Sequence, residues 1–235
     1  TINRVKINAD EPLKPQPVEE PHPMDRAAAK NAWHDFTRIF GFVVAVIVGA
    51  WAINTFIFQS FDVVGPSMEP TLEGQNGSDR VLVNRLPVTF ARLQGKPYVP
   101  KRGDIIVFKS TALTSTGQPE YVVKRVTGLP GERMVVKDCH LYVHNQEHPE
   151  GFDPYPTFKN LAPNDKEVNL CVAGEGTDIT VPQGEIFVDG DHRYGNYSTD
   201  SRNGGGRPSL GTIPFENIVG PVGVRLWPVN KIKLF

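Results

Sequence analysis

The sequence predicts a mostly β fold of folded antiparallel sheets or a partly closed barrel, preceded by one transmembrane α-helix. Short β-branched runs separated by glycine- and proline-containing turns recur after residue 100, as in 104–108, 121–127 and 185–188. This pattern is typical of an all-β domain. Ahead of them, the residues from Ile39 to Phe58 carry no formal charge. As a helix rising about 1.5 Å per residue, this segment is long enough to cross a hydrocarbon core of roughly 30 Å.

Residues 1–38 are predicted to form a cytoplasmic tail that is largely disordered. Proline and charge without an apolar period characterise its first part, and the alanine-rich stretch Asp25–Thr37 favours a helical lead-in to the membrane. No basic residue occurs between residues 59 and 79. The basic residues close to the span all precede it: Arg26, Lys30 and Arg38. This asymmetry predicts a cytoplasmic N-terminus and places the chain after the span outside, on the periplasmic face.

A cleavable signal peptide is the alternative interpretation of the apolar segment. The region before it is far longer than the n-region of a signal peptide, and the apolar run continues past Ala50-Trp51-Ala52, its A-x-A pattern. We therefore expect an uncleaved anchor at residues 39–58. Because Thr1 can follow either a removed methionine or a trimmed segment, the native N-terminus is left undetermined.

The part of the chain after the anchor is expected to fold as one β core with an insertion. Residues 137–182 are more polar, with clusters of Asn, Asp, Pro and Gly, and predict an inserted β subdomain between core segments 59–136 and 183–235. The C-terminal stretch 224–235 mixes aromatic, aliphatic and basic residues. This stretch is expected to form either a closing strand of the sheet or a contact with the membrane surface, and the sequence does not decide between them.

Charge, cysteine and histidine patterns narrow the function. The formal net charge of −1 gives no long-range attraction for nucleic acid, so we expect no nucleic-acid partner. The cysteines, Cys139 and Cys171, would face an oxidising space. A disulfide between them and two buried free thiols are the two alternatives there. Histidines at 140, 144 and 148 would share a helix face, but a strand is expected there, and we predict no metal site.

Ser67 and Lys124 are the candidate catalytic pair. Ser67 lies in the run 65–72, nine residues beyond the anchor, and Lys124 lies inside the β-branched stretch 121–127. A serine hydroxyl needs a base, and a neutral amine can serve if burial lowers its pKa from about 10.4. A lone lysine more often extends its amine out of a strand into water. The residues around the pair decide between these alternatives.

Those residues resemble bacterial type I signal peptidases, the leader peptidases. Four segments match the boxes of that family in order: Pro66–Leu72 with the serine, Arg102–Phe108, Tyr121–Glu132 with the lysine, and Gly190–Arg202. With the anchor, they cover the chain from about residue 39 to its end. A single such match is moderate support, whereas four in order make chance resemblance very improbable.

The resemblance implies a role for each matching residue. Ser67 would attack the scissile carbonyl with Lys124 as general base, and the Ser67 main-chain N–H would stabilise the oxyanion. Ser198 matches a serine that hydrogen-bonds the lysine amine. Two structural ion pairs are also implied: Arg125 with Asp191, and Asp200 with Arg202. The family uses neither cofactor nor metal.

Two departures from the family pattern affect this assignment. Gly65 stands where the enteric branch carries a hydroxyl that assists the oxyanion hole, so a second donor is not identified. In the last box His192 replaces the usual asparagine, and residues 194–197 lengthen the segment by two residues. The placement of these extra residues determines the assignment of Ser198.

Substrate specificity is expected to rest on shallow apolar pockets beside an extended peptide, because Ala-x-Ala motifs present small side chains at alternate positions. The positions that match the family's pocket are Val63, Val64, Met68, Leu72, Val122 and Val123. Plain core packing is the alternative for each of them.

The sequence thus predicts a membrane-bound serine endopeptidase that removes signal peptides from exported preproteins, acting as a monomer in the bacterial plasma membrane. One alternative is a specialised relative, such as an organellar inner-membrane or conjugation-type maturation peptidase. Another is an inactive, membrane-tethered β domain that binds exported chains. Self-cleaving repressors share a serine–lysine pair but need a DNA-binding module, and here an anchor takes its place.

Overall fold

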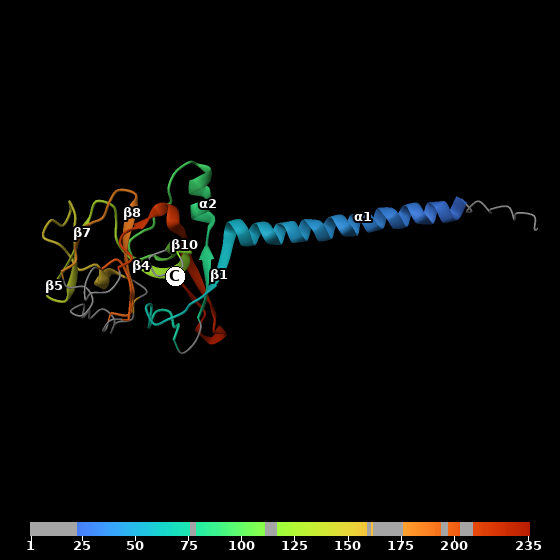
Figure 1. Cartoon of the computed structure of the whole chain (residues 1–235). Coiled ribbons are helices and arrows are strands. Elements are labelled where there is room, and N and C mark those ends of the chain that lie inside the picture. The colour runs from blue at the N-terminus through green and yellow to red at the C-terminus, as the bar shows by residue number, and fades with distance from the viewer. Residues whose placement is uncertain are drawn as a thin grey trace, which may run out of the picture. The chain divides into compact units, whose positions relative to one another are not determined.

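The computed structural model describes residues 23–75, 79–110, 117–158, 161, 176–193, 197–202 and 209–235 (Figure 1). The chain divides into two compact units, with the boundary between Ala50 and Trp51. Cys171 lies outside the described residues, as do residues 1–22 of the tail predicted at 1–38.

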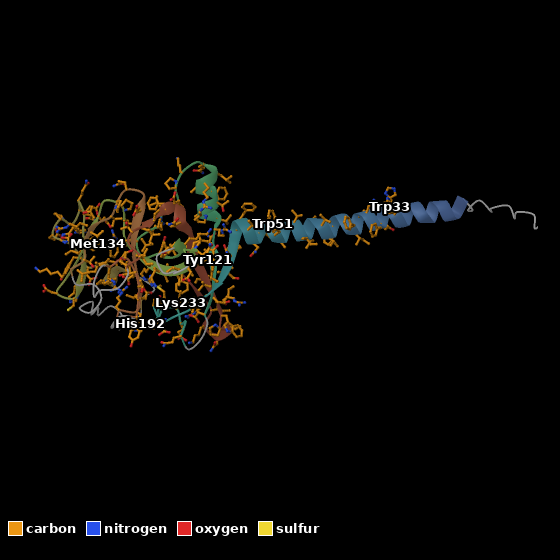
Figure 2. All side chains as sticks on the ribbon, in the orientation of Figure 1. Trp33, Trp51, Tyr121, Met134, His192 and Lys233 are labelled. Carbon is orange, nitrogen blue, oxygen red and sulfur yellow. The ribbon has the colours of Figure 1, made fainter. Side chains whose placement is uncertain are left out.

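The first unit consists of most of helix α1 (Pro23–Ala52), which continues into a short π-helical turn η1 (Ile53–Ile57). The stretch Trp33–Ile57 is long and apolar enough to cross a membrane, with 25 residues and a mean hydropathy of 2.1. Figure 2 shows Trp33 and Trp51 on this helix. Helix α1 includes the helical lead-in expected at Asp25–Thr37, and Phe58, expected as the last residue of the anchor, is already the first residue of strand β1 (Phe58–Asp62).

A large antiparallel sheet dominates the second unit, and the mostly β prediction is confirmed. Its strands run in the order β1-β2-β10-β3-β4-β8-β9, with β11 paired to β10. The bounds are β2 (Arg80–Asn84), β3 (Ile105–Ser110), β4 (Glu120–Gly128), β8 (Glu185–Asp189), β9 (Ile213–Pro214), β10 (Ile218–Trp227) and β11 (Lys233–Leu234). The sheet does not close, because β1 and β9 lie at opposite ends of this order.

A smaller sheet has the order β6-β5-β7, with β5 (Arg133–Lys137), β6 (His140–His144) and β7 (Asp178–Thr180). It therefore begins at Arg133, a few residues before the insertion expected at residue 137. Cys139, in the turn between β5 and β6, is disulfide-bonded. His140 and His144 lie at the two ends of strand β6 and so do not share a helix face.

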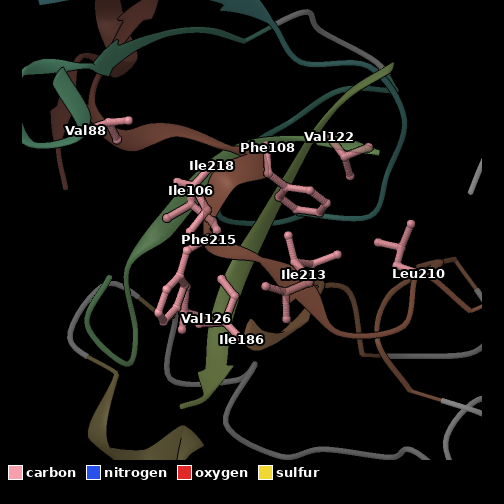
Figure 3. Packing of buried hydrophobic residues seen from close by; sticks show 11 residues of the cluster. Val88, Ile106, Phe108, Val122, Val126, Ile186, Leu210, Ile213, Phe215 and Ile218 are labelled. Atoms are coloured by element: carbon pink, nitrogen blue, oxygen red, sulfur yellow. The ribbon is translucent and has the colours of Figure 1, made fainter. Parts of the chain in front are cut away.

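Three apolar clusters fill the second unit, because alternate residues of each strand point to the same face. One cluster lies between β3, β4, β8 and β10 and includes Ile106, Phe108, Val126 and Ile218 (Figure 3). A second lies under the small sheet around Met134. The C-terminal stretch adds the short strand β11 to β10, where Val224 pairs with Leu234. Helix α2 (Leu86–Leu93) follows β2 and contributes Val88 to the first cluster.

Candidate active site

Ser67 begins a tight turn just after β1. The preceding Gly65 has φ +84°, a conformation that side chains disfavour, and its N–H donates to the Gly74 carbonyl at 3.2 Å. The other end of the loop is equally close, because a Cβ added at Gly74 would lie 2.3 Å from the Gly65 carbonyl oxygen. This packing holds the Ser67 loop in one place against the sheet.

Lys124 reaches Ser67 from the middle of strand β4. It pairs with Ile106 of β3, and its side chain is only 3% exposed. The Nζ atom donates a hydrogen bond to Ser67 Oγ at 2.5 Å. The structure therefore brings together the serine and the lysine that sequence analysis singled out.

The environment of Lys124 favours its neutral form. Burial lowers the pKa of the Lys124 amine to about 8, with Arg202 acting in the same direction. The carboxylates of Asp200, Asp191 and Asp189 oppose this shift. The amine is thus poised close to neutral pH, where it can accept a proton.

The segment Gly190–His192 supports the Ser67 main chain. The His192 N–H donates to the Ser67 carbonyl oxygen at 3.1 Å, and His192 Nδ1 lies 3.0 Å from the Pro66 carbonyl oxygen. Gly190 allows this approach, because an added Cβ would lie 2.3 Å from the Ser67 carbonyl oxygen and 2.2 Å from Ser198 Oγ. Any side chain at residue 190 would push the nucleophile loop away.

Two buried ion pairs lie behind the pair of reactive residues. Arg125 points to the opposite face of β4 from Lys124 and grips Asp191 with two hydrogen bonds of 2.7 and 2.6 Å, while its third nitrogen donates to the Gly103 carbonyl. Arg202 Nε donates to Asp200 at 2.8 Å. Burial alone would raise the pKa of Asp200, but the Arg202 guanidinium more than offsets this and holds it below its usual value.

Comparison with known proteins identifies the family to which this arrangement belongs. Residues 35–227 match the family model described as signal peptidase, peptidase S26. The chain belongs to the signal peptidase family. Signal peptidase I P of Bacillus subtilis subsp. natto is 36% identical over 191 residues, which cover 81% of this chain and 88% of that protein. Signal peptidase I T of Bacillus subtilis strain 168 is 31% identical over 219 residues, which cover 92% and 98%.

A crystal structure of a signal peptidase I from Enterococcus faecalis V583 also matches, at 27% identity and a TM-score of 0.33, over 52% of this chain and 95% of that one. Membership makes this chain a serine peptidase of the signal-peptide-processing type. Its apolar N-terminal helix is compatible with membrane anchoring.

Ser198 differs from the expectation drawn from the family. Its Oγ is buried and makes no hydrogen bond to Lys124, and its hydroxyl lies close enough to the Asp200 carboxylate to help lower the pKa of that group. The expected bond to the lysine amine is not formed, because Lys124 Nζ is directed to Ser67 Oγ and Ser198 packs against Gly190 instead. Residues 194–196, which carry the extra length of this box, lie outside the described residues.

A cleft of about 300 Å³ opens beside Ser67 and Lys124. Four of the residues expected to bind substrate line it: Val63, Val64, Val122 and Val123. The other two, Met68 and Leu72, are fully buried in the apolar cluster beneath the Ser67 loop. Their side chains hold the loop down and do not line the cleft, since the turn after Ser67 carries both of them inward.

Two aromatic residues of the cleft were missed by sequence analysis. Phe61 and Tyr121 both line it, and their rings lie 5.0 Å apart, centroid to centroid. Phe61 stands two positions before the pair Val63-Val64, and Tyr121 stands directly before the pair Val122-Val123. Their closeness to these valine pairs was the available signal.

Proposed function

We propose that this signal peptidase cleaves exported preproteins after an Ala-x-Ala-like motif, with Ser67 as nucleophile and Lys124 as general base. The hydrogen bond of 2.5 Å between Nζ of the buried Lys124 and Oγ of the half-buried Ser67 is the observation that carries the proposal. Neither residue needs a cofactor or a metal for this chemistry.

The reaction follows from that contact. Lys124 Nζ takes the proton of Ser67 as Oγ bonds to the scissile carbonyl carbon, and the carbonyl oxygen becomes an oxyanion. The Ser67 N–H, which has no acceptor among the described residues, is available to stabilise that oxyanion. As the carbon–nitrogen bond breaks, the Lys124 ammonium returns its proton to the leaving amine. Water then hydrolyses the acyl ester by the same path in reverse.

The substrate is proposed to bind as an added strand along the cleft. Of the described strands, the first half of β4, from Glu120 to Lys124, pairs with β3 alone, because pairing with β8 begins at Arg125. Strand β1 pairs with β2 alone. Both open edges therefore face the cleft, where an extended peptide can form main-chain hydrogen bonds.

The small cleft supports a preference for small side chains. Val63 and Val64 face Val122 and Val123 across about 300 Å³, which leaves shallow apolar pockets at alternate positions of an added strand. The ion pairs of Arg125 with Asp191 and Arg202 with Asp200 position the lysine strand and the Gly190 segment, and Ser198 packs next to them.

Location is part of the same proposal. The helix Trp33–Ile57 is proposed to anchor a monomer in the bacterial plasma membrane, with a cytoplasmic N-terminus and the core of 59–136 and 183–235 on the outer face. Anchoring confines enzyme and signal peptide to one plane and so raises their effective concentration. Organellar and conjugation-type peptidases share this layout, whereas an inactive binding domain would not require an assembled serine–lysine pair.

Cleavage of a reconstituted preprotein tests the proposal. We expect Ser67→Ala and Lys124→Met to abolish cleavage, while Lys137→Met, an exposed lysine on β5, leaves it unchanged. Folding of each variant is checked by circular dichroism and thermal unfolding. A folded parent chain that binds the preprotein without cutting it would support the binding-domain alternative, and activity in either active-site variant would remove the assigned residue from the mechanism.

A further inference from the structure

His192, which is labelled in Figure 2, lies at the candidate active site without a role in the proposed reaction. Its main-chain N–H donates to the Ser67 carbonyl oxygen at 3.1 Å, and its Nδ1 atom lies 3.0 Å from the Pro66 carbonyl oxygen. A carbonyl oxygen only accepts hydrogen bonds, so Nδ1 carries the proton of this contact. One residue therefore holds the carbonyls of both peptide units that flank the Ser67 Cα atom.

The contact with Pro66 also determines how the Ser67 N–H is directed, because a peptide unit is rigid. The Pro66–Ser67 bond is trans, so its C=O and N–H groups lie in one plane and point in opposite directions. Fixing the direction of the Pro66 carbonyl therefore fixes the direction of the Ser67 N–H. This N–H is the proposed oxyanion donor, and such a donor is effective when it already points to the place where the charge develops.

The nucleophile loop by itself holds this peptide unit only in part. Gly65, directly before the loop's Pro66, has φ +84° and gives the backbone there a freedom that other residues lack. The Pro66 carbonyl also accepts a hydrogen bond from the Glu69 N–H at 3.0 Å, but that bond joins two residues of the same turn and moves with it. Among the described residues, the hydrogen bond from His192 is the one that ties this carbonyl to a separate part of the chain.

The segment that carries His192 is itself held in place. Asp191, the residue before it, receives two hydrogen bonds from Arg125 at 2.7 and 2.6 Å, and both side chains are buried. Arg193, the residue after it, is also buried, with its guanidinium 3.4 Å from the centre of the Tyr155 ring. A side chain positions another group accurately only if its own position is fixed. His192 meets this condition on both sides.

We propose that His192 is a positioning residue of the peptidase, whose Nδ1–H holds the Pro66–Ser67 peptide unit in the orientation that presents the Ser67 N–H to the oxyanion. The inference rests on the function proposed above, in which Ser67 attacks the scissile carbonyl. In this role His192 does not touch the substrate, and the proton of Ser67 still passes to Lys124. Loss of the imidazole should therefore destabilise the tetrahedral intermediate and leave binding of the uncleaved peptide unchanged.

Three substitutions in the full chain separate the hydrogen-bond donor from the bulk of the side chain. His192→Leu removes the donor, whereas His192→Asn keeps an N–H close to the position of Nδ1 in a side chain similar in size to leucine. His144→Leu is the matched control, because Nδ1 of His144 also lies 3.0 Å from a prolyl carbonyl, that of Pro149, in the small sheet and away from the cleft. Thermal unfolding checks that each variant is folded.

Cleavage of a preprotein bearing Ala-x-Ala gives the first measurement. We expect kcat to fall about tenfold in His192→Leu, which is less than the roughly 100- to 1,000-fold loss from removing a whole oxyanion donor, because Glu69 still holds the Pro66 carbonyl. KM should hardly change. His192→Asn should recover most of the loss, and His144→Leu should cleave at the parent rate. Parent kcat in His192→Leu, or no recovery in His192→Asn, would overturn the proposal.

A peptide aldehyde gives a readout that a purely structural role would not change. Ser67 Oγ adds to the aldehyde carbon while Lys124 takes the hydroxyl proton, so the adduct carries an oxyanion like that of the intermediate. In His192→Leu its inhibition constant should rise by the factor by which kcat falls, while the dissociation constant of the matching peptide alcohol, which forms no adduct, stays unchanged. Equal weakening of both ligands would assign His192 to the shape of the cleft and overturn the proposal.

The parent chain separates the two ways in which the inference can fail. A parent that does not cleave the preprotein would remove the proposed function and the role of His192 together. An active parent with an equally active His192→Leu variant would remove the role of His192 alone and leave the proposed function standing.

Discussion

Tyr155 donates a hydrogen bond from its hydroxyl to the carboxylate of Asp189, and neither side chain is accessible to water. Burial raises the pKa of both groups. The Arg193 guanidinium lies 3.4 Å from the centre of the Tyr155 ring and opposes both shifts by its charge. In the register of the sheet, Asp189 of β8 lies opposite Arg125 of β4, and Arg125 directly follows Lys124 in that strand. This contact ties Tyr155 to β8, the strand next to the one that carries the proposed general base.

Removing the Tyr155 hydroxyl should therefore destabilise the protein. Tyr155→Phe leaves a buried carboxylate oxygen without its donor, which costs about 1–3 kcal/mol of unfolding free energy. Urea unfolding in detergent measures the loss. Tyr142→Phe, a half-buried tyrosine on β6, serves as the control and should change stability much less. Equal stability in the two variants would mean that Asp189 does not depend on Tyr155.

The pH dependence of cleavage should report the state of Lys124. The lysine accepts a proton only when neutral, and its pKa is lowered to about 8. We expect kcat/KM to rise tenfold per pH unit below this value and to level off above it. Cleavage of a preprotein across pH 6 to 10 measures this limb. A limb near the ordinary lysine pKa, or none, would contradict the assignment.

Burial of Lys124 should also cost stability, in a defined pH window. Its pKa falls from 10.5 in the unfolded chain to about 8 in the folded one, so the penalty is complete below pH 8 and disappears as pH rises toward 10.5. Lys124→Met should then stabilise the fold by on the order of 3 kcal/mol below pH 8. Unfolding at pH 7 and pH 10 tests the sign, because the gain must shrink at the higher pH.

Gly190 should tolerate no side chain. A Cβ there would lie 2.3 Å from the Ser67 carbonyl oxygen, whereas at Gly223 the nearest atom would lie 3.7 Å away. Gly190→Ala is expected to lower the free energy of unfolding by about 1–3 kcal/mol. It should also reduce kcat more than it changes KM, since it displaces the nucleophile. Gly223→Ala should be close to neutral. Wild-type kcat in Gly190→Ala would show that the loop does not need this contact.

The two kinds of arginine–aspartate pair should differ sharply. Arg125 and Asp191 are 1% and 0% exposed, whereas Arg133 and Asp178 on the small sheet are 54% and 50% exposed. Arg125→Met removes both hydrogen bonds to the buried Asp191, which keeps only Arg193 at 3.6 Å, and should cost about 3–5 kcal/mol. Arg133→Met should cost less than about 1 kcal/mol. Thermal unfolding of both variants compares them, and similar losses would refute the distinction.

Local pattern was enough to anticipate the β architecture, whereas the meeting of Ser67 with Lys124 was anticipated from the resemblance to the family. β-Branched runs form strands here because their side chains fill the faces of the sheets, as Ile106 and Val126 do. Local pattern was not enough to place Met68 and Leu72. Apolar residues in the turn after the nucleophile look the same in sequence whether they pack into the core or line the cleft. Only the three-dimensional path of the turn separates the two outcomes.

Helix α2 shows a signal that was present but not used. Its apolar residues repeat at helical spacing, and Pro87 occupies the first turn, where proline is favoured. Its hydrogen bonds to Phe56 and Ile57, by contrast, depend on the packing of the folded unit and leave no mark in local sequence. The burial of Tyr155 against Asp189 is equally non-local.

The hydrogen bond from Nδ1 of His192 to Pro66 joins residues 126 positions apart in the chain. A nascent polypeptide that has been synthesised only as far as Lys124 therefore still lacks the support of its own nucleophile loop. If Ser67 is the nucleophile, as proposed, we therefore expect cleavage activity to appear only after the segment around His192 has been synthesised and has folded against the Ser67 loop.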